Sequence, residues 1–353
     1  MEEERLFDLD ERFALCRSTA VTDEIVRFLE DTAFGTKENL YRHFYIREYV
    51  ANNPSTEFFF ARDKQNNLEM AGLVALCSHQ FEGDPPYEGI YIRYFAASPK
   101  VKGQKIVGRL SIDVIDFLRK RQETPAIFYG TVEGRNKASK AIADLLKFQF
   151  YAPLTVTGFS RFFPKKNASV QRVSAEEWKD LLPKLDALYA DYAFWTHDCL
   201  NLNNDYYVLK KEGKIICGAQ AHPGHWVVEK MPGFVGKYIV PLVPYIPLLR
   251  NVFNPRAFHF LNFEGIYFEK GHEADLVELF EGILHSKGYH SALILLDERD
   301  PLYKFLLEQG QLGLLARFTA GTHTTFAIDF TRYPEKEAEL KGRLCYAKGY
   351  DYI

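Results

Sequence analysis

Apolar and polar residues follow the same order in the two halves of the chain. Each half opens with a short strand and a helix, at residues 15–29 and again at 170–182. Ser174 stands before the second of these helices and Glu177 follows three residues later, which is the pattern of a capping box. The first helix has Thr22 in the capping position. The pattern therefore predicts a capped helix near the start of each half.

Two β-hairpins are predicted next, one in each half. Residues 58–76 contain two apolar runs that are separated by Gln65–Asn67, and residues 206–221 contain two that are separated by Glu212–Gly213. Polar and glycine residues between apolar runs of this length are typical of tight turns. A glycine, Gly72 or Gly218, follows in the return strand of each hairpin.

The second part of each half alternates between strands and helices. A hexapeptide strand, YEGIYI at 87–92, returns as FEGIYF at 263–268, and four of its six positions are identical. Each copy precedes an amphipathic helix with apolar residues at helical spacing, such as Val107, Leu110 and Val114. Further strands are predicted at 126–132 and 291–296, with helices at 137–148 and 301–309.

This order predicts an α/β (α+β) protein with mixed sheets that is built from two similar domains. We expect the domains at residues 1–166 and 170–353, joined at the polar stretch 164–171. The alternative is a pair of unrelated α/β domains that share only their alternation of helices and strands.

Composition limits the class of protein. The chain has 353 residues, of which 47% are hydrophobic and 26% charged, and a formal net charge of −3. These values are typical of a soluble two-domain protein, and the lack of a basic excess argues against a nucleic-acid partner. The five cysteines are scattered without a CxxC pair, which favours a reducing compartment.

Neither a leader nor a membrane span is predicted. The first residues are acidic, and the most apolar stretch, 238–249, is short and contains three prolines. We therefore expect a cytoplasmic protein with no membrane partner.

The segment 91–120 resembles the loop and helix of the GNAT (GCN5-related N-acetyltransferase) family, whose loop has the form R/Q-x-x-G-x-G/A. Val101–Val107 occupies the loop: Lys102 and Gly103 fit, whereas Lys105 and Val107 replace small residues. Residues 133–150 are similar to a second element of the family, N-x-x-A/S-x-x-L-Y-x-x-x-G-F. Here Asn136 fits, and Ala143 stands in place of the tyrosine.

The resemblance implies two tandem GNAT-like acyl-CoA N-acyltransferase domains. The first would bind acetyl-CoA or another acyl-CoA as substrate, because the free amides and dipole of a helix start attract the pyrophosphate. The second would be a degenerate GNAT-like domain, since only EKGHE follows Phe268 before the next helix. The implied coenzyme A contacts are Phe95, Ala96, Ala97, Lys102, Gly103, Gln104, Lys105, Ile106 and Asn136.

Acyl transfer to an amine also needs a base and a proton donor. By the resemblance Glu88 is the candidate base and Tyr151, or else Tyr129, the candidate donor. Glu264 repeats Glu88 in the half without a loop, so a structural pairing of these glutamates with Arg17 or Arg172 is the alternative. A buried tyrosine with a satisfied hydroxyl is the alternative for Tyr151.

Two further stretches carry weaker signals. His222 and His225 form an HxxH pair without further ligands at suitable spacing, so we expect two solvated loop histidines and no metal site. Residues 236–255 interrupt the repeat and contain Pro241, Pro244 and Pro247. This insertion could form an apolar wall of a substrate groove or an apolar plug between the domains.

The predicted function is a coenzyme A-dependent N-acyltransferase that acts on the amine of a small molecule or peptide. One alternative is a catalytically silent GNAT-like protein that binds a ligand or serves as a scaffold. Another is an acyltransferase that uses a charged tRNA, against which the lack of basic excess counts. The sequence leaves open the acceptor, the acyl-chain length and the oligomeric state.

Overall fold

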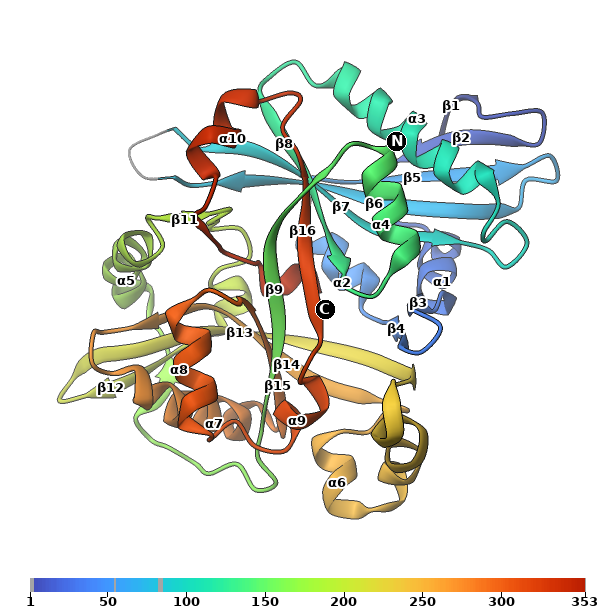
Figure 1. The fold of residues 1–353 in the computed structure, drawn as a ribbon. Coiled ribbons are helices and arrows are strands. Elements are labelled where there is room, and N and C mark those ends of the chain that lie inside the picture. The colour runs from blue at the N-terminus through green and yellow to red at the C-terminus, as the bar shows by residue number, and fades with distance from the viewer. Residues whose placement is uncertain (1–2, 54, 82–84, 353) are drawn as a thin grey trace. The chain divides into compact units, whose positions relative to one another are not determined.

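The computed structural model describes residues 3–53, 55–81 and 85–352, which form two compact units (Figure 1). Unit 1 contains the chain up to His79, then Pro86–Tyr151 and Thr324–Lys341. Unit 2 contains, of the residues that the structure describes, Ala152–His323, 342–352, Gln80, Phe81 and Pro85. Among the described residues, no helix is long and apolar enough to cross a membrane.

Unit 1 has one mixed sheet with the strand order β1-β2-β5-β6-β7-β8-β16. All neighbouring strands are antiparallel except β7 and β8, which are parallel. The strands are β1 (Glu4–Asp8), β2 (Phe13–Ser18), β5 (Thr56–Asp63), β6 (Leu68–His79), β7 (Tyr87–Ala97), β8 (Ala126–Glu133) and β16 (His323–Asp329).

Helices cover both faces of this sheet. They are α1 (Asp23–Asp31), α2 (Ile46–Ala51), α3 (Lys105–Arg121), α4 (Lys137–Leu145) and α10 (Pro334–Leu340), with a small hairpin of β3 (Phe34–Gly35) and β4 (Leu40–His43) before α2. The apolar stripe of α3 packs on the sheet, where Leu110 joins Ile90 and Phe128 in one buried cluster. Burial of each such side chain stabilises the folded protein by about 1.5–3 kcal/mol relative to exposure to water. The helix predicted after Thr22 is confirmed, because this side chain caps α1.

Unit 2 has a second mixed sheet with the order β9-β15-β14-β13-β12-β10, in which only β14 and β15 are parallel. The strands are β9 (Gln149–Ser160), β10 (Val170–Arg172), β12 (Tyr206–Lys211), β13 (Lys214–Lys230), β14 (Phe258–Phe268) and β15 (Ser291–Asp297). A separate pair consists of β11 (Tyr192–Ala193) and β17 (Leu344–Cys345). The remaining elements are α5 (Ala175–Leu188), η1 (Leu202–Asn204), η2 (Val235–Ile239), η3 (Val240–Tyr245), α6 (Pro247–Val252), η4 (Glu273–Asp275), α7 (Leu276–Lys287), α8 (Pro301–Gln309), α9 (Leu315–Thr319) and η5 (Gly349–Tyr352).

Local signals in the second half are confirmed. Ser174 and Glu177 form the capping box that begins α5. Glu212 and Gly213 form the two-residue turn between β12 and β13, and both have positive φ angles, +49° and +77°. This is the turn geometry that matches the twist of a hairpin.

The two units do not coincide with consecutive halves of the chain, 1–166 and 170–353. Strand β9 follows unit 1 in sequence but pairs with β15 in the sheet of unit 2. Strand β16 follows unit 2 but pairs with β8 in the sheet of unit 1. Each unit is therefore completed by a strand from the other half. Hydrophobic periodicity could not show this, because it reports that a strand exists and not which edge it joins.

The two hexapeptides lie at different places on corresponding strands. In β7 the register against β6 shifts between Arg93 and Ala96, whereas in β14 the register against β13 shifts between Glu264 and Tyr267. The residues before these two bulges are thus Arg93 and Glu264. Glu88 lies five residues earlier, so its apparent equivalence to Glu264 is wrong, although the fold is doubled as predicted.

Candidate functional site

Strand β7 separates from β8 halfway along its length. The two strands pair from Glu88 to Tyr91, and the pairing stops there. The later part of β7 remains paired with β6 only, up to Ala97 opposite Met70. Beyond Tyr91, β7 therefore no longer belongs to the ladder with β8.

A β-bulge lies in the separated part of β7. Arg93 pairs with Leu73 and Ala96 with Ala71, so Tyr94 and Phe95 together oppose Gly72. Tyr94 has φ +53°, which is uncommon for a residue other than glycine. A bulge leaves its extra residue outside the ladder and redirects the backbone, and bulges of this kind are frequent beside active sites. The predicted contacts Phe95, Ala96 and Ala97 all lie at or just after this bulge.

A buried aromatic and basic cluster lies beside the bulge. The guanidinium of Arg93 is 4.0 Å from the centre of the Tyr94 ring and 4.4 Å from that of Tyr49. The His43 ring is 5.3 Å from the Tyr94 ring. Burial, with a smaller contribution from Arg93, lowers the pKa of His43 well below its usual range. Its imidazole is therefore neutral near pH 7, and the lowered pKa also makes it a weaker base than an exposed histidine.

Sequence reasoning missed this cluster. His43 and Tyr49 come from the segment before the β5–β6 hairpin, about fifty residues ahead of the bulge. No local motif joins them to it, since they meet only through the fold. The only available signal was the aromatic content of residues 41–49.

The turn before α3 leaves backbone donors unpaired. Gln104 has the extended backbone of an N-cap residue, φ −83° and ψ 154°, but its side chain makes no capping hydrogen bond. Within the described part of the chain, the amides of Gly103, Lys105 and Ile106 have no hydrogen-bond acceptor. Side chains cap α1, α4, α5 and α8, whereas α2, α6, α7, α9 and α10 resemble α3 in lacking a side-chain cap. An uncapped helix start of this kind is suited to an anion.

Charge and shape at this turn agree with that interpretation. Lys102 and Lys105 are exposed, and the first turn of α3 has no acidic residue. Gly103 has φ +80°, and a Cβ placed on it would have no atom within 4 Å, so the turn is open. Val107 packs against the core of unit 1. Neither lysine is buried in the turn and Val107 is directed elsewhere, so these side chains do not close it.

The corresponding place in unit 2 is different in charge and is filled by the chain itself. The turn before α7 contains Glu273 and Asp275, which disfavour a phosphate at that helix start. At the bulge in β14, the Gly265 amide donates to the Tyr346 hydroxyl at 3.2 Å, and the Tyr206 hydroxyl donates to the Gly265 carbonyl at 2.7 Å. Side chains of unit 2 itself therefore occupy both backbone groups of Gly265 at the bulge of β14.

Glu88 is not brought to the bulge. It is exposed near the start of β7, where Gln122 and Thr124 donate hydrogen bonds to its carboxylate at 2.6 and 2.7 Å. Six residues of extended strand, about 20 Å, separate it from Tyr94. A side chain at that distance cannot act at a thioester held beside the bulge. Its predicted structural partners are also wrong, because Arg17 pairs with Glu57 and Arg172 with Asp205.

Asn136 and Tyr151 lie elsewhere in unit 1. The Asn136 side chain accepts a hydrogen bond from the Ser139 amide at 3.1 Å and so caps α4. Tyr151 is near the start of β9, and its ring is 6.3 Å from that of Phe330. Their predicted roles in coenzyme binding and proton donation stay predictions.

The two histidines of the HxxH pair are not in a solvated loop, which corrects the expectation. Both lie inside β13, where residues three apart point to opposite faces of the sheet. His222 is 2% exposed and its Nε2 lies 2.9 Å from Glu264, while His225 stacks on His259 with ring centres 4.1 Å apart. No group of three or more metal-ligating side chains occurs in the part of the chain that the structure describes.

Solved structures of other proteins have a similar fold. Saccharomyces cerevisiae N-myristoyltransferase with bound myristoyl-CoA is similar at 9% sequence identity and a TM-score of 0.59, over 93% of this chain and 84% of that one. The same yeast enzyme with myristoyl-CoA and inhibitors is similar at 10% identity and a TM-score of 0.58, over 93% and 85%. No protein-family model and no curated protein sequence matches the chain. The chain therefore shares the fold of N-myristoyltransferase, which is doubled as the internal order of its elements predicts.

Proposed function

We propose that the protein is a coenzyme A-dependent N-acyltransferase whose acyl-CoA site lies in unit 1. The amides of Gly103, Lys105 and Ile106, with the charge of Lys102, bind the pyrophosphate. The pantetheine then follows β7 past residues 95–97 toward the bulge. The observation that carries this proposal is the uncapped, cationic start of α3, directly after a strand that has separated from its neighbour.

The reaction in this proposal joins the acyl group to an amine of a small molecule or peptide. The amine nitrogen attacks the thioester carbonyl, a C–N bond forms, and the C–S bond breaks. The backbone amide of Phe95, in the β7 bulge, is the proposed donor to the oxyanion, because fixed donors stabilise this charge in other acyl transfers. His43 is the proposed acceptor of the amine proton, because its ring is neutral and contacts Tyr94. Tyr151 remains the proposed donor to the departing thiolate.

Unit 2 is the proposed degenerate half, since the start of α7 is acidic and its bulge is filled. The likeness to a structure that holds myristoyl-CoA supports an acyl-CoA substrate in general. The length of the acyl chain and the identity of the amine acceptor are left to experiment. A cytoplasmic location belongs to the proposal as well, and the free thiols of the cysteines support it.

The first test is calorimetric titration with acetyl-CoA and with myristoyl-CoA. We expect micromolar binding of at least one of them, and about tenfold weaker binding for Lys102→Glu, because the variant places a negative charge beside the pyrophosphate. Lys120→Glu makes the same charge change at the exposed end of the same helix and should bind as the wild type does. Absence of heat and of a thermal shift with both ligands would refute the proposal. Binding without turnover of any amine would favour the silent ligand-binding alternative.

The second test separates the two candidate bases. His43→Gln should lower kcat about a hundredfold or more with little change in acyl-CoA affinity. Glu88→Gln should keep its hydrogen bonds to Gln122 and Thr124 and leave kcat unchanged. If Glu88→Gln lowers kcat and His43→Gln leaves it unchanged, Glu88 is the base and His43 is not.

A further inference from the structure

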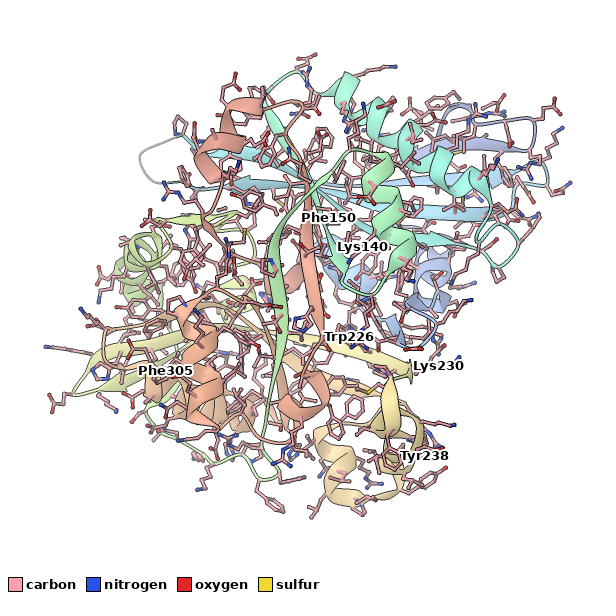
Figure 2. The ribbon with its side chains drawn as sticks, viewed as in Figure 1. Lys140, Phe150, Trp226, Lys230, Tyr238 and Phe305 are labelled. Atoms are coloured by element: carbon pink, nitrogen blue, oxygen red, sulfur yellow. The ribbon has the colours of Figure 1, made fainter. Side chains whose placement is uncertain are left out.

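A long excursion, which we call the 231–255 lobe, connects β13 to β14 in unit 2. It contains η2, η3 and α6, and Figure 1 shows it in gold at the end of these two strands. Its base is fixed, because Trp226 pairs with Phe258 and the Val228 amide donates to the Pro255 carbonyl at 2.7 Å. Figure 2 shows Tyr238 on the lobe, with Lys230 and Trp226 on the strand that leads to it. The lobe is thus a short helical element held at the end of a two-stranded stem.

The lobe exposes large apolar side chains to solvent. Phe234 is 70% exposed and Tyr245 69% exposed, while Val240, Val243 and Val252 point inward and are buried. The other exposed apolar residues of the lobe are Val235, Tyr238, Ile239, Leu242, Ile246 and Leu248. So many exposed apolar groups within fifteen residues mark a surface that binds something, since monomeric proteins seldom leave such groups together in water.

The charged residues within the lobe itself have one sign. From Lys230 to Phe263 the sequence contains no aspartate or glutamate. The same stretch carries Lys230, Lys237, Arg250 and Arg256, all of them exposed. Apolar residues with basic neighbours and no acidic ones are the composition of segments that lie in the interface of an anionic bilayer.

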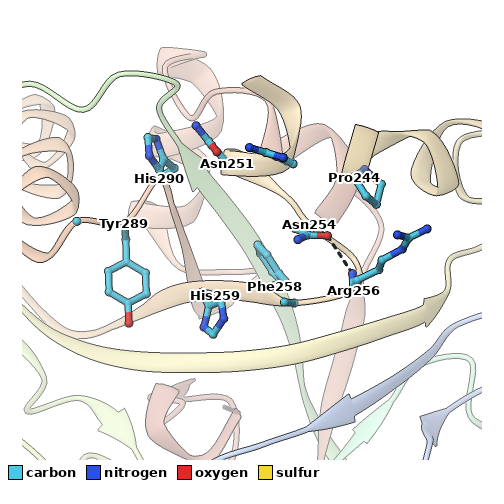
Figure 3. A pocket seen from close by; sticks show the side chains of 11 residues that line it. Pro244, Asn251, Asn254, Arg256, Phe258, His259, Tyr289 and His290 are labelled. Carbon is cyan, nitrogen blue, oxygen red and sulfur yellow. Dashed lines mark hydrogen bonds between the residues drawn. The ribbon is translucent and has the colours of Figure 1, made fainter. Parts of the chain in front are cut away.

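A cationic pocket opens at the base of the lobe. It has a volume of about 670 Å³, and Arg250, Arg256, His259 and His290 line it (Figure 3). Arg256 is oriented there, because its backbone amide donates to the Asn254 side chain at 3.2 Å and its guanidinium to the Tyr245 hydroxyl at 2.7 Å. No carboxylate occurs among the described residues that line this pocket. Its size and charge suit the phosphate of a lipid headgroup.

We propose that the 231–255 lobe docks unit 2 on the surface of a bilayer that contains anionic lipids. The exposed apolar side chains enter the headgroup region, and the pocket residues Arg250 and Arg256 face the phosphates. The sequence-based expectation of no membrane partner depended on the length of the apolar run, which excludes a spanning helix and does not address interfacial contact. The basic charge of the lobe favours an anionic bilayer as its occupant.

Vesicle co-sedimentation of the full-length protein tests this proposal. We expect binding to phosphatidylcholine vesicles that contain phosphatidylserine, weaker binding to pure phosphatidylcholine, and a decrease as salt rises. The variant Phe234→Ser/Tyr238→Ser/Leu242→Ser should lower the partition coefficient about tenfold or more, and Arg250→Glu/Arg256→Glu should remove the preference for phosphatidylserine. Both sets of positions are exposed, so circular dichroism and thermal unfolding should match the wild type.

The matched control replaces exposed apolar residues of unit 2 outside the lobe. Phe163 is 73% exposed and Leu307 48% exposed, and Phe163→Ser/Leu307→Ser should bind vesicles as the wild type does. The proposal is overturned if the wild type does not sediment with phosphatidylserine vesicles at low salt. It is also overturned if the lobe variant and the control lose binding equally. Self-association that the lobe variant abolishes, without vesicle binding, would show that a second copy covers the lobe.

Discussion

Glu264 is held inside unit 2 by two hydrogen bonds. Its side chain is 1% exposed, with Oε1 at 2.9 Å from His222 Nε2 and Oε2 accepting from the Tyr350 amide at 2.7 Å. Both of its carboxylate oxygens therefore have partners. It links β13 and β14 to the end of the chain, which gives a single side chain an unusual share of the stability of unit 2.

Glu264→Ala should lower the free energy of unfolding by about 2–4 kcal/mol, because it leaves the buried His222 ring and the Tyr350 amide without their acceptor. Glu264→Gln keeps an acceptor and should cost less. The measurement is urea unfolding at pH 7. Glu308→Ala, at an exposed position of α8, is the control and should change stability by less than about 0.5 kcal/mol. Equal losses for Glu264→Ala and Glu308→Ala would contradict the structural role.

His225 predicts a loss of stability in acid. Burial, and then the neighbouring His259, lower the pKa of His225 from its usual 6.5 to about 4. Its ring is neutral in the folded protein, whereas the unfolded chain binds a proton first. The contribution of His225 to the free energy of unfolding is therefore complete above pH 6.5. It is lost as pH falls from 6.5 to 4, which lowers this free energy by about 2–3 kcal/mol. His225→Gln should flatten the dependence of the urea midpoint between pH 7 and 4.5, and an unchanged slope would contradict this.

At the residue scale, the sequence could indicate the turn at Lys102–Ile106 but not the groups around it. Lys102 and Gly103 are recognisable because they are neighbours in a short motif. His43 and Arg93 are fifty residues apart in the chain and meet only when β4 and β7 are folded. Glu88 shows the converse, since the repeated hexapeptide suggested an equivalence to Glu264 that the registers of β7 and β14 do not support.

At the scale of elements, α3 packs well against the core of unit 1, but its N-terminus lacks a side-chain cap. Its apolar stripe belongs to the main core of unit 1, yet its first turn has no side-chain cap. A helix that remains uncapped has a less stable first turn than it could have, and the proposed anion would supply the missing acceptors. A substitution that caps α3 should therefore raise the stability of the protein and weaken its binding of acyl-CoA.

Gln104→Asp tests that opposition. Aspartate in the extended N-cap conformation of Gln104 should stabilise the protein by about 0.5–1 kcal/mol, through a capping hydrogen bond and the helix dipole. The same carboxylate should weaken acyl-CoA binding about tenfold, because it occupies the amides and repels the pyrophosphate. Thermal unfolding and calorimetric titration measure the two effects, with Gln104→Asn, which supplies a cap without the charge, as control. A variant that binds more tightly would contradict the proposed site.

Elements with local determinants were predictable, and those defined by pairing were not. The capping box of α5 and the turn at Glu212–Gly213 are set by residues within four positions of one another. The bulge at Tyr94 and the partner of β9 depend on strands that are distant in sequence. A pattern of apolar residues fixes which face of a strand is buried, and it leaves the choice of neighbour to the whole chain.

At the scale of the whole molecule, the exchange of β9 and β16 ties each unit to both halves of the chain. Unit 1 cannot complete its sheet without β16, which comes after all of unit 2 except its last residues. Unit 2 begins its sheet with β9, which continues directly from the segment that ends unit 1. We therefore expect the units to unfold together.

Tryptophan fluorescence can test this coupling, because Trp178, Trp195 and Trp226 all belong to unit 2. Leu110→Ala removes a buried side chain of unit 1 and should cost about 2–5 kcal/mol. If the units unfold together, this variant lowers the urea midpoint of the fluorescence transition. Leu145→Ala, at an exposed position of α4, is the control. An unchanged midpoint for Leu110→Ala would show that the units unfold independently.

The exchanged strand β16 also has a consequence for synthesis on the ribosome. Strand β8 is complete at Glu133, but its partner begins only at His323, roughly 190 residues later. At usual rates of translation this interval is about 10–40 s. During that time a nascent chain presents an unpaired strand edge, which is a template for pairing with other chains. We expect that the newborn protein needs a chaperone to shield this edge until translation ends.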